Sequence, residues 1–191
     1  MPGQLPLFES DGAELSVDDL DGVLLGTGHV VRRDGQARVS VLVDEVWRAE
    51  ALCAEFDARG LDTTYEINRD EGSALLVRSA LTDRLNPIAD RWQLGRRRTG
   101  RTIKLTGAAL RLWVLCAGRR TEAGYLLGLA PSEEIRWAPA GAALAEVGLT
   151  ATLVGPRGGG PAYRVTSAKR LARLAALTGP RPDMAPEYVW P

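Results

Sequence analysis

The sequence predicts an α+β fold in which one αββαββα unit occurs twice, each copy with its own antiparallel sheet. Two short apolar segments, residues 20–28 and 110–118, have the composition of helices and end on glycines, which stop helices because they adopt the left-handed conformation easily. The copies keep a nearly constant offset, since Leu20 and Leu110 are 90 residues apart and later matching positions are 88 apart. Segments typical of β-hairpins follow each helix. A sustained offset of this kind indicates an internal duplication.

Composition excludes several classes of protein. The 191 residues are 45% hydrophobic, enough for one domain or two closely joined halves, and no apolar run is long enough to cross a membrane. The first residues lack a signal-peptide pattern, and Cys53 and Cys116 fit no metal or redox spacing, so we expect reduced cysteines in a cytoplasmic protein. The 24 basic and 24 acidic residues cancel, which lowers the expectation of nucleic-acid binding, because phosphate recognition normally needs a basic excess.

The first half is expected over residues 16–92, after an N-terminal arm over 1–15. Ser16 and Asp19 form a capping-box pattern that begins the first helix, which ends at Gly26. Asp34-Gly35 is a strong signal for a hairpin turn. The elements that we expect after the first helix are strands over 29–33 and 37–43, a helix over 45–58 capped by Asp44, strands over 62–69 and 73–79, and a helix over 80–92 interrupted near Asn86-Pro87.

The second half is expected over residues 107–178, after a basic linker over 93–106. The charge run in the linker favours a solvated segment, with a strap that contacts phosphates as the alternative; its cations are Arg96, Arg97, Arg98, Arg101 and Lys104. The pattern then predicts a short strand or turn after Gly118, strands over 125–130, 150–154 and 162–166, a helix from Ser132 that Pro139 kinks, and a last helix from Ser167 to Leu177. The Pro-rich residues 179–191 are expected to form a tail without regular structure.

This element order, with a helix of the degenerate pattern L-x-G-x-L-x-x-x-G opening each half, resembles the LAGLIDADG homing endonucleases over about residues 16–178. The resemblance implies that the two motif helices pack together at a pseudo-twofold axis. It also implies that the two four-stranded sheets form a saddle, the surface with which that family covers a DNA duplex.

In that family, an acidic residue immediately before the last glycine of each motif holds the metal ions that cleave DNA. The corresponding residues are Thr27 and Ala117, which have no carboxylate, and Asp21 lies two turns away on the first helix. Hard divalent cations need oxygen ligands of this kind. We therefore expect no bound metal and no nuclease activity.

Strand alternation predicts which side chains face the saddle and which, such as Tyr65 and Ile67, pack against the helices. The predicted saddle positions are Arg38, Ser40, Leu42, Thr64, Glu66, Asn68, Leu76, Arg78, Leu126, Gly128, Thr152, Val154, Arg164 and Thr166. The set has few cations and several apolar members. Such a surface favours a small-molecule pocket over a DNA duplex.

Glu66 is the only carboxylate of that set and is expected beside Arg78, so it is a candidate general acid or base; the alternative is an exposed ion pair of little energetic value. His29, the only histidine, follows the first motif and is the second catalytic candidate, with a structural hydrogen-bonding role as the alternative. The residues predicted to bind substrate are Arg38, Arg78, Arg164, Leu42, Leu76, Asn68 and Thr152.

Two functions follow from these patterns. The first is a cofactor-independent enzyme that performs acid/base condensation or cyclisation, for example a Pictet–Spengler-type closure, on an amino-acid-derived small molecule, because the sequence has no dinucleotide, P-loop or metal motif. The alternative is a non-cleaving DNA-binding protein that uses the linker cations together with Arg32, Arg33, Arg119 and Arg120 at hairpin tips. Either protein is expected to be a monomer or a homodimer that does not bind membranes.

Overall fold

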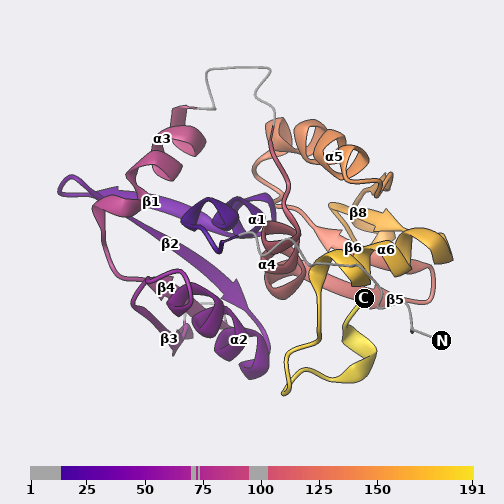
Figure 1. Cartoon of the computed structure of the whole chain (residues 1–191), viewed down its shortest axis with the longest axis horizontal. Helices are drawn as coiled ribbons and strands as arrows, with labels where there is room; N and C mark the ends of the chain where they lie inside the picture. The colour runs from indigo at the N-terminus through magenta and orange to yellow at the C-terminus, as the bar shows by residue number, and fades with distance from the viewer. Residues whose placement is uncertain (1–13, 70–71, 73, 95–102) are drawn as a thin grey trace, which may run out of the picture.

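The computed structural model, which describes residues 14–69, 72, 74–94 and 103–191, contains two four-stranded antiparallel sheets with the same strand order (Figure 1). The first sheet has the order β1-β2-β4-β3 and the second the order β5-β6-β8-β7. The strands of the first sheet are β1 (His29–Arg33), β2 (Gln36–Val43), β3 (Thr63–Ile67) and β4 (Leu75–Ser79). The strands of the second sheet are β5 (Gly118–Thr121), β6 (Gly124–Gly128), β7 (Thr152–Val154) and β8 (Ala162–Val165). The identical orders confirm the predicted duplicated α+β architecture.

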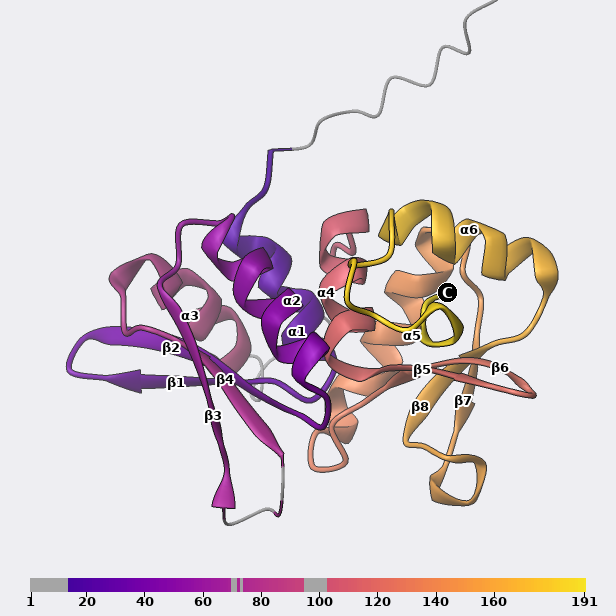
Figure 2. The ribbon, with the colours of Figure 1, turned by 90° about the horizontal axis from the view of Figure 1, so that it is seen from below.

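Helices cover one side of both sheets and leave the other side open (Figure 2). The α-helices are α1 (Asp21–Leu25), α2 (Val46–Asp57), α3 (Asn86–Leu94), α4 (Gly107–Ala117), α5 (Trp137–Glu146) and α6 (Ala168–Thr178). Short 3-10 turns are η1 (Val17–Leu20), η3 (Asp83–Leu85), η5 (Glu134–Arg136), η6 (Pro156–Gly158) and η7 (Glu187–Val189). None of the described helices combines the length and the apolar character that a membrane crossing requires. Below the sheets in Figure 2, the end of β3, the start of β4 and the β7–β8 connection extend downward.

The helices α1 and α4 pack against each other at the centre of the molecule. A Cβ atom on Gly22 would lie 1.7 Å from the backbone oxygen of Ala109, and one on Gly26 would lie 2.7 Å from Sγ of Cys116. Any larger residue would push the helices apart, so these two glycines set the distance between them. The hydrophobic core is continuous across this contact and is therefore shared by both halves.

The start of the first half follows the capping-box pattern, with the N–H of Ser16 donating to Oδ2 of Asp19 at 3.0 Å. Two predicted helix details are wrong. Asp44 does not cap α2, because its side chain is exposed and instead lies 3.9 Å from Nε of Arg48. Pro87 does not interrupt a helix, because α3 begins one residue earlier and a proline in the first turn needs no N–H.

Tyr65 and Ile67 are also placed differently from the prediction. They are 40% and 64% exposed, although their partners across the ladder, Val77 and Leu75, are buried. The reason is that β3 is the outermost strand of its sheet, so its side chains lie at the margin of the core.

In the second half, Ser167 caps α6 as predicted, since its Oγ accepts from the N–H of Arg170 at 3.2 Å. Ser132 does not begin a helix: the η5 turn precedes α5, which begins only at Trp137. Pro139 therefore lies in the first turn of α5, where it needs no N–H and does not kink the helix.

The C-terminal residues form a docked segment and not a free tail, which corrects the prediction. Trp190 is 6% exposed and belongs to the main core, and its indole N–H donates to the carbonyl of Gly179 at 3.1 Å. Its own carbonyl accepts from the guanidinium of Arg120 at 2.8 Å. The hydroxyl of Tyr125 donates to the carbonyl of Val189 at 3.1 Å. These hydrogen bonds and the burial of Trp190 hold the C-terminal segment beside β5.

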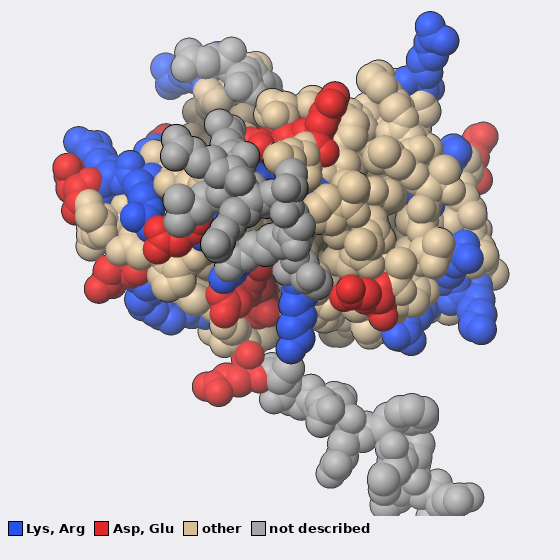
Figure 3. All heavy atoms as spheres, turned by 90° about the horizontal axis from the view of Figure 1, so that it is seen from above, with Lys and Arg blue, Asp and Glu red and all other residues tan. Residues whose placement is uncertain are grey.

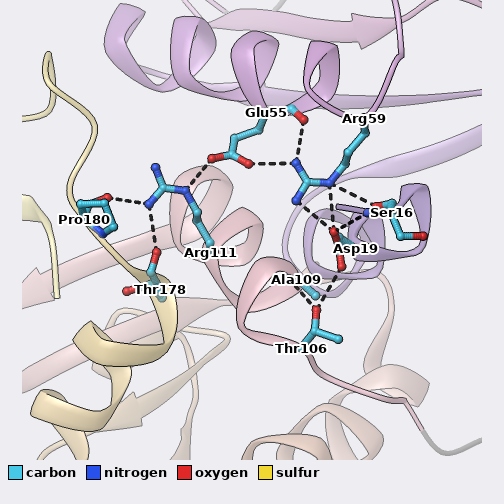
Figure 4. Close-up of polar contacts among 9 residues, drawn as sticks. All are labelled: Ser16, Asp19, Glu55, Arg59, Thr106, Ala109, Arg111, Thr178 and Pro180. Atoms are coloured by element: carbon cyan, nitrogen blue, oxygen red, sulfur yellow. Dashed lines mark hydrogen bonds and ion pairs between the residues drawn. The ribbon is translucent and has the colours of Figure 1, made fainter. Parts of the chain in front are cut away.

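A buried charge network connects η1, α2, α4 and the beginning of the C-terminal segment (Figure 4). The guanidinium of Arg59 contacts Asp19 at 3.0 Å and Glu55 at 2.8 Å, and its side chain is fully buried. Glu55 also accepts from Arg111 at 2.5 Å, and Arg111 donates in turn to the carbonyl of Thr178 at 2.9 Å. The network therefore joins the first half to the second.

Candidate nucleic-acid interface

We call the side of the two sheets that faces away from the helices the saddle face. In β2, every second residue from Ala37 to Val43 is buried against the helices, so Arg38 and its alternate neighbours point to the saddle face. The register places Arg78 of β4 opposite Ser40, in the same set. The first sheet therefore presents Arg38 and Arg78 on its saddle face.

The second sheet presents two further arginines on the saddle face. Arg119, Leu126, Arg164 and Thr152 form one row across β5, β6, β8 and β7. The guanidinium of Arg119 donates to the carbonyl of Gly159 at 2.6 Å. We call Arg38, Arg78, Arg119 and Arg164 the saddle arginines. Within the part of the chain that the structure describes, no hydrogen bond or ion pair engages Arg38 or Arg164.

Leu126 and Val154 do not present apolar surface on the saddle face, contrary to the prediction. They are 2% and 8% exposed and form a small cluster of their own with Ala162. The connection between β7 and β8 folds back over them: a Cβ on Gly159, where φ is +83°, would lie 3.4 Å from Leu126. The saddle face of the second sheet is therefore less apolar than alternation alone implies.

Among the described strands, Glu66 is the one carboxylate on the saddle face, whereas Asp44 and Glu45 follow β2 near the centre of the molecule. Glu66 of β3 forms an ion pair with Arg78, and 58% of its side chain is exposed. A different face of the molecule, which includes α3 and α5, carries acidic and basic side chains next to one another and a wide uncharged area on the α5 side (Figure 3). Among the described strand residues, the arginines of the saddle face therefore outnumber its carboxylates.

A central groove of about 700 Å³ lies between the two halves. Both halves line it: Leu42 and Thr27 from the first, Ala117, Arg119 and Pro161 from the second, and Tyr188 from the C-terminal segment. More of its wall is apolar than polar, so its interior differs from the charged sheet surfaces on either side.

Arg48 is a buried cation in the wall of this groove. Its guanidinium, from α2 of the first half, donates to the carbonyls of Leu115 at 2.8 Å and Gly118 at 2.7 Å at the end of α4. These carbonyls have no partner within the helix, and a cation near a helix C-terminus is favourable. Arg48 is therefore committed to holding the two halves together at the groove.

Comparison with solved structures identifies the architecture. The homing endonuclease I-WcaI bound to its DNA recognition sequence matches with a TM-score of 0.55 and 11% identity, over 86% of this chain and 80% of that chain. I-DmoI in complex with DNA and Mn matches with a TM-score of 0.51 and 12% identity, over 86% of this chain and 96% of that chain. The chain has a homing-endonuclease-like fold. Neither the models of protein families nor the curated proteins provide a match to the sequence.

The residues at the helix ends of this homing-endonuclease-like fold do not fit a divalent cation. Thr27 and Ala117 both line the groove and neither has a carboxylate. Oγ of Thr27 is buried and has no hydrogen-bond partner among the described residues. Asp21 is engaged elsewhere, since it accepts from Arg91 at 2.8 Å and from the indole of Trp92 at 2.6 Å. In the described ranges, no group of three or more His, Cys, Asp or Glu is placed to hold a metal.

Cys116 also lines the groove but does not have the properties of a nucleophile. Its side chain is 7% exposed. Burial raises the pKa of Cys116 to about 12, so the thiol stays protonated at neutral pH.

The predicted site residues are not brought to one place. His29 is exposed and lines a separate pocket of about 360 Å³ with Trp92, Glu133 and Arg136, whereas Glu66 lines neither pocket. Of the residues predicted to bind substrate, only Leu42 lines the central groove. Five of the others lie on strands, and Asn68 follows the end of β3; the five are Arg38, Leu76, Arg78, Arg164 and Thr152. Catalysis by Glu66 or His29 stays a prediction.

Arg48 was not predicted from the sequence to lie at this interface. Tyr188, together with Trp190, was expected either to fold over the saddle or to contact a partner chain, and Tyr188 lines the groove. Arg119 was expected at a hairpin tip, but it lies inside β5. It pairs with Leu126, whereas its neighbour Arg120 pairs with the core residue Tyr125, so the side chain of Arg119 points to the saddle face. Arg32 was also expected at a tip and instead contacts the backbone oxygen of Asn86 on α3 at 3.0 Å. No local sequence signal marks Arg48, because its position depends on contacts between distant segments.

Proposed function

We propose that this chain binds double-stranded DNA with its saddle face and does not cleave it. The carrying observation is that the register places Arg38, Arg78, Arg119 and Arg164 on the saddle faces of both sheets. Arginine on a concave surface suits a duplex because phosphate contacts supply most of the affinity. The one carboxylate on these rows, Glu66, neutralises only Arg78.

The zero net charge does not oppose this function, because many carboxylates are used inside the fold. Asp19 and Glu55 neutralise arginines in the buried network, and Asp21 holds Arg91. These carboxylates lie on the helix side and contribute little field at the saddle face. Because salt screens distant charges, a bound phosphate interacts mainly with the charges near it and much less with the net charge of the whole protein.

The homing-endonuclease-like fold supports the proposal, since both similar structures were determined with DNA. Loss of both acidic positions supports binding without cleavage. Phosphate contacts by the linker remain a further prediction. Lys104 is exposed, and the linker arginines at 96, 97, 98 and 101 lie outside the described residues.

A salt titration of DNA affinity tests the proposal. Fluorescence anisotropy with a 20-bp duplex of arbitrary sequence should give a dissociation constant that rises steeply with salt. The double variant R38A/R164A, with one arginine removed from each sheet, should bind several-fold more weakly and reduce the slope of log K against log salt by about two. Lys169→Ala is the control, because Lys169 is an exposed cation on α6, on the helix side.

Absence of measurable binding at low salt would remove the proposal. Equal affinities of the wild type and R38A/R164A would also contradict it, because DNA would then be held by another surface. Circular dichroism of both variants establishes that they are folded.

The second candidate is the cofactor-independent small-molecule enzyme, which the apolar wall of the central groove favours. The groove supports the binding of an apolar molecule. It gives no support to acid/base chemistry, because neither Glu66 nor His29 lines it. If a substrate is found, Glu66→Gln should abolish turnover without unfolding the protein, and full activity in that variant would end the assignment.

A further inference from the structure

We propose that the central groove receives an unpaired nucleobase, so that the protein binds DNA with an extrahelical base more tightly than a regular duplex. This inference rests on the proposed function, since the saddle arginines hold the DNA over the groove. It goes beyond that function because it names the kind of DNA that the site prefers.

The position of the groove is the first argument. Arg119 lies in its wall, and Arg38 is on the same strand as Leu42 of its wall. The β7–β8 connection contributes Gly159 and Gly160 to the wall. Phosphates are therefore contacted on both sides of a cavity whose lining is mostly apolar. A regular duplex has nothing that gains from entering such a cavity, since its outer surface is charged. An extrahelical base does gain, because its two faces are flat and poorly hydrated.

Tyr188 is the second argument. Tyr188 is 72% exposed and lines the groove, so its ring is accessible to a ligand. The residues after it are fixed: Val189 accepts from Tyr125, and Trp190 is buried in the core. The ring is thus presented from an ordered backbone, so stacking a base on it costs little conformational entropy.

The groove also offers the few polar groups that a base edge requires. Glu45, half-exposed in the wall, accepts from Nε of Arg48 at 3.0 Å and keeps a second carboxylate oxygen. A small number of polar groups in an apolar cavity is the usual composition of a site that orients a flat ligand.

The energetics favour a base that is already unpaired. Extracting a paired base costs a few kcal/mol of stacking and pairing, whereas a bulged base has lost most of that stabilisation before it binds. The expected ligand is therefore DNA with a bulge, and a fully paired duplex binds through the arginines alone.

The experiment compares two 20-bp duplexes of one sequence, one fully paired and one with a single unpaired adenine at its centre, by fluorescence anisotropy at the same salt concentration. We expect the bulged duplex to bind about tenfold more tightly, the size of one base–aromatic stack. In Tyr188→Ala the ratio of the two affinities should fall to about one, while Tyr188→Phe should keep it. Tyr65→Ala is the matched control, because Tyr65 is also exposed but lies on β3 outside the groove.

The outcomes are separable. If the wild type binds both duplexes equally, the inference fails and duplex binding stands. A preference that survives in Tyr188→Ala also overturns it, because bulged DNA bends easily and would then be favoured by shape alone. If neither duplex binds at low salt, the proposed function itself fails.

Discussion

Thr27 and Ala117 stand at the point where the two central helices meet the groove. A Cβ on Gly26 would lie 3.2 Å from Cβ of Ala117, so the two helix ends are in direct contact. Side chains at positions 27 and 117 could therefore reach one shared ligand, although neither residue has the carboxylate that a hard cation needs. Introducing carboxylates at positions 27 and 117 therefore tests whether the two helix ends converge.

Aspartates placed at both positions should create a cation site. The double variant T27D/A117D should unfold at a lower temperature than the wild type without metal, because two carboxylates would face each other at helix C-termini. Addition of MnCl2 should raise its melting temperature, since carboxylates are suitable ligands for Mn²⁺. The wild type under the same conditions is the control. A variant that does not respond to MnCl2 would show that the helix ends do not converge as described.

At the scale of elements, the α1–α4 contact depends on the absence of side chains. Gly22→Ala should lower the free energy of unfolding by about 3 kcal/mol, because its Cβ would lie 1.7 Å from the oxygen of Ala109 and the helices would have to separate. Urea unfolding measures the difference. Gly155→Ala is the control, as a Cβ there has no atom within 4 Å. Equal stabilities of Gly22→Ala and the wild type would mean that the helices are not this close.

The C-terminal segment is the second element whose role can be measured. Trp190→Ala should cost about 3–5 kcal/mol, the usual cost of truncating a buried aromatic residue, because Trp190 belongs to the main core. Thermal unfolding should show a single transition at lower temperature. Met184→Ala, at a position 73% exposed in the same segment, should leave the transition unchanged. A small effect of Trp190→Ala would indicate that the segment is not docked in solution.

Local signals in the sequence predicted the elements well. Three of these signals depend on neighbouring residues only: the capping pattern at Ser16, the cap at Ser167 and the Asp34-Gly35 turn. Alternation along β2 was enough to predict that Arg38 faces the saddle. Features that depend on distant segments were missed. Leu126 is buried because the β7–β8 connection folds over it, and the sequence of that connection does not indicate which way the chain turns. The docked C-terminal segment belongs to the same class.

Arg48 illustrates the same limit at the site. From the sequence it is an ordinary arginine in a helix, yet its guanidinium reaches the carbonyls of Val114, Leu115 and Gly118 in the other half. Only the crossing of α2 and α4 brings those groups together. The groove could not be predicted either, because its walls come from seven separate segments of the chain.

At the scale of the whole molecule, the two halves are joined by ion pairs as well as by the core. Glu55 is the centre of the network because it accepts from Arg59 and Arg111. Burial acts to raise the pKa of Glu55, but the hydrogen bonds and charges of Arg111 and Arg59 outweigh burial and lower that pKa. A carboxyl group with a lowered pKa stabilises the folded state where it is ionised and loses this effect as pH falls.

Glu55→Gln should therefore destabilise the protein in a pH-dependent way. At pH 7 we expect a loss of about 3 kcal/mol, because two arginines lose their buried partner. Since the pKa in the unfolded state is about 4.3, the stabilisation is complete above roughly pH 5 and disappears as pH falls through the lower pKa of the folded state. Urea unfolding at pH 7, 5 and 3.5 should show the two proteins becoming similar.

The control is Glu50→Gln, which removes an exposed carboxylate from the same helix and should change little at any of these pH values. A constant difference between the wild type and Glu55→Gln from pH 7 to pH 3.5 would contradict the lowered pKa and leave only a loss of packing.

The docked C-terminal segment has a practical consequence for handling the protein. Because Trp190 is in the core and Tyr188 stands at the edge of the groove, any polypeptide continued beyond Pro191 starts within a few residues of both. An affinity tag or a fluorescent fusion placed there would crowd the cavity or strain the docked residues. Labels for binding assays therefore belong on solvent-facing positions of α6, such as Ala172, on the helix-covered side.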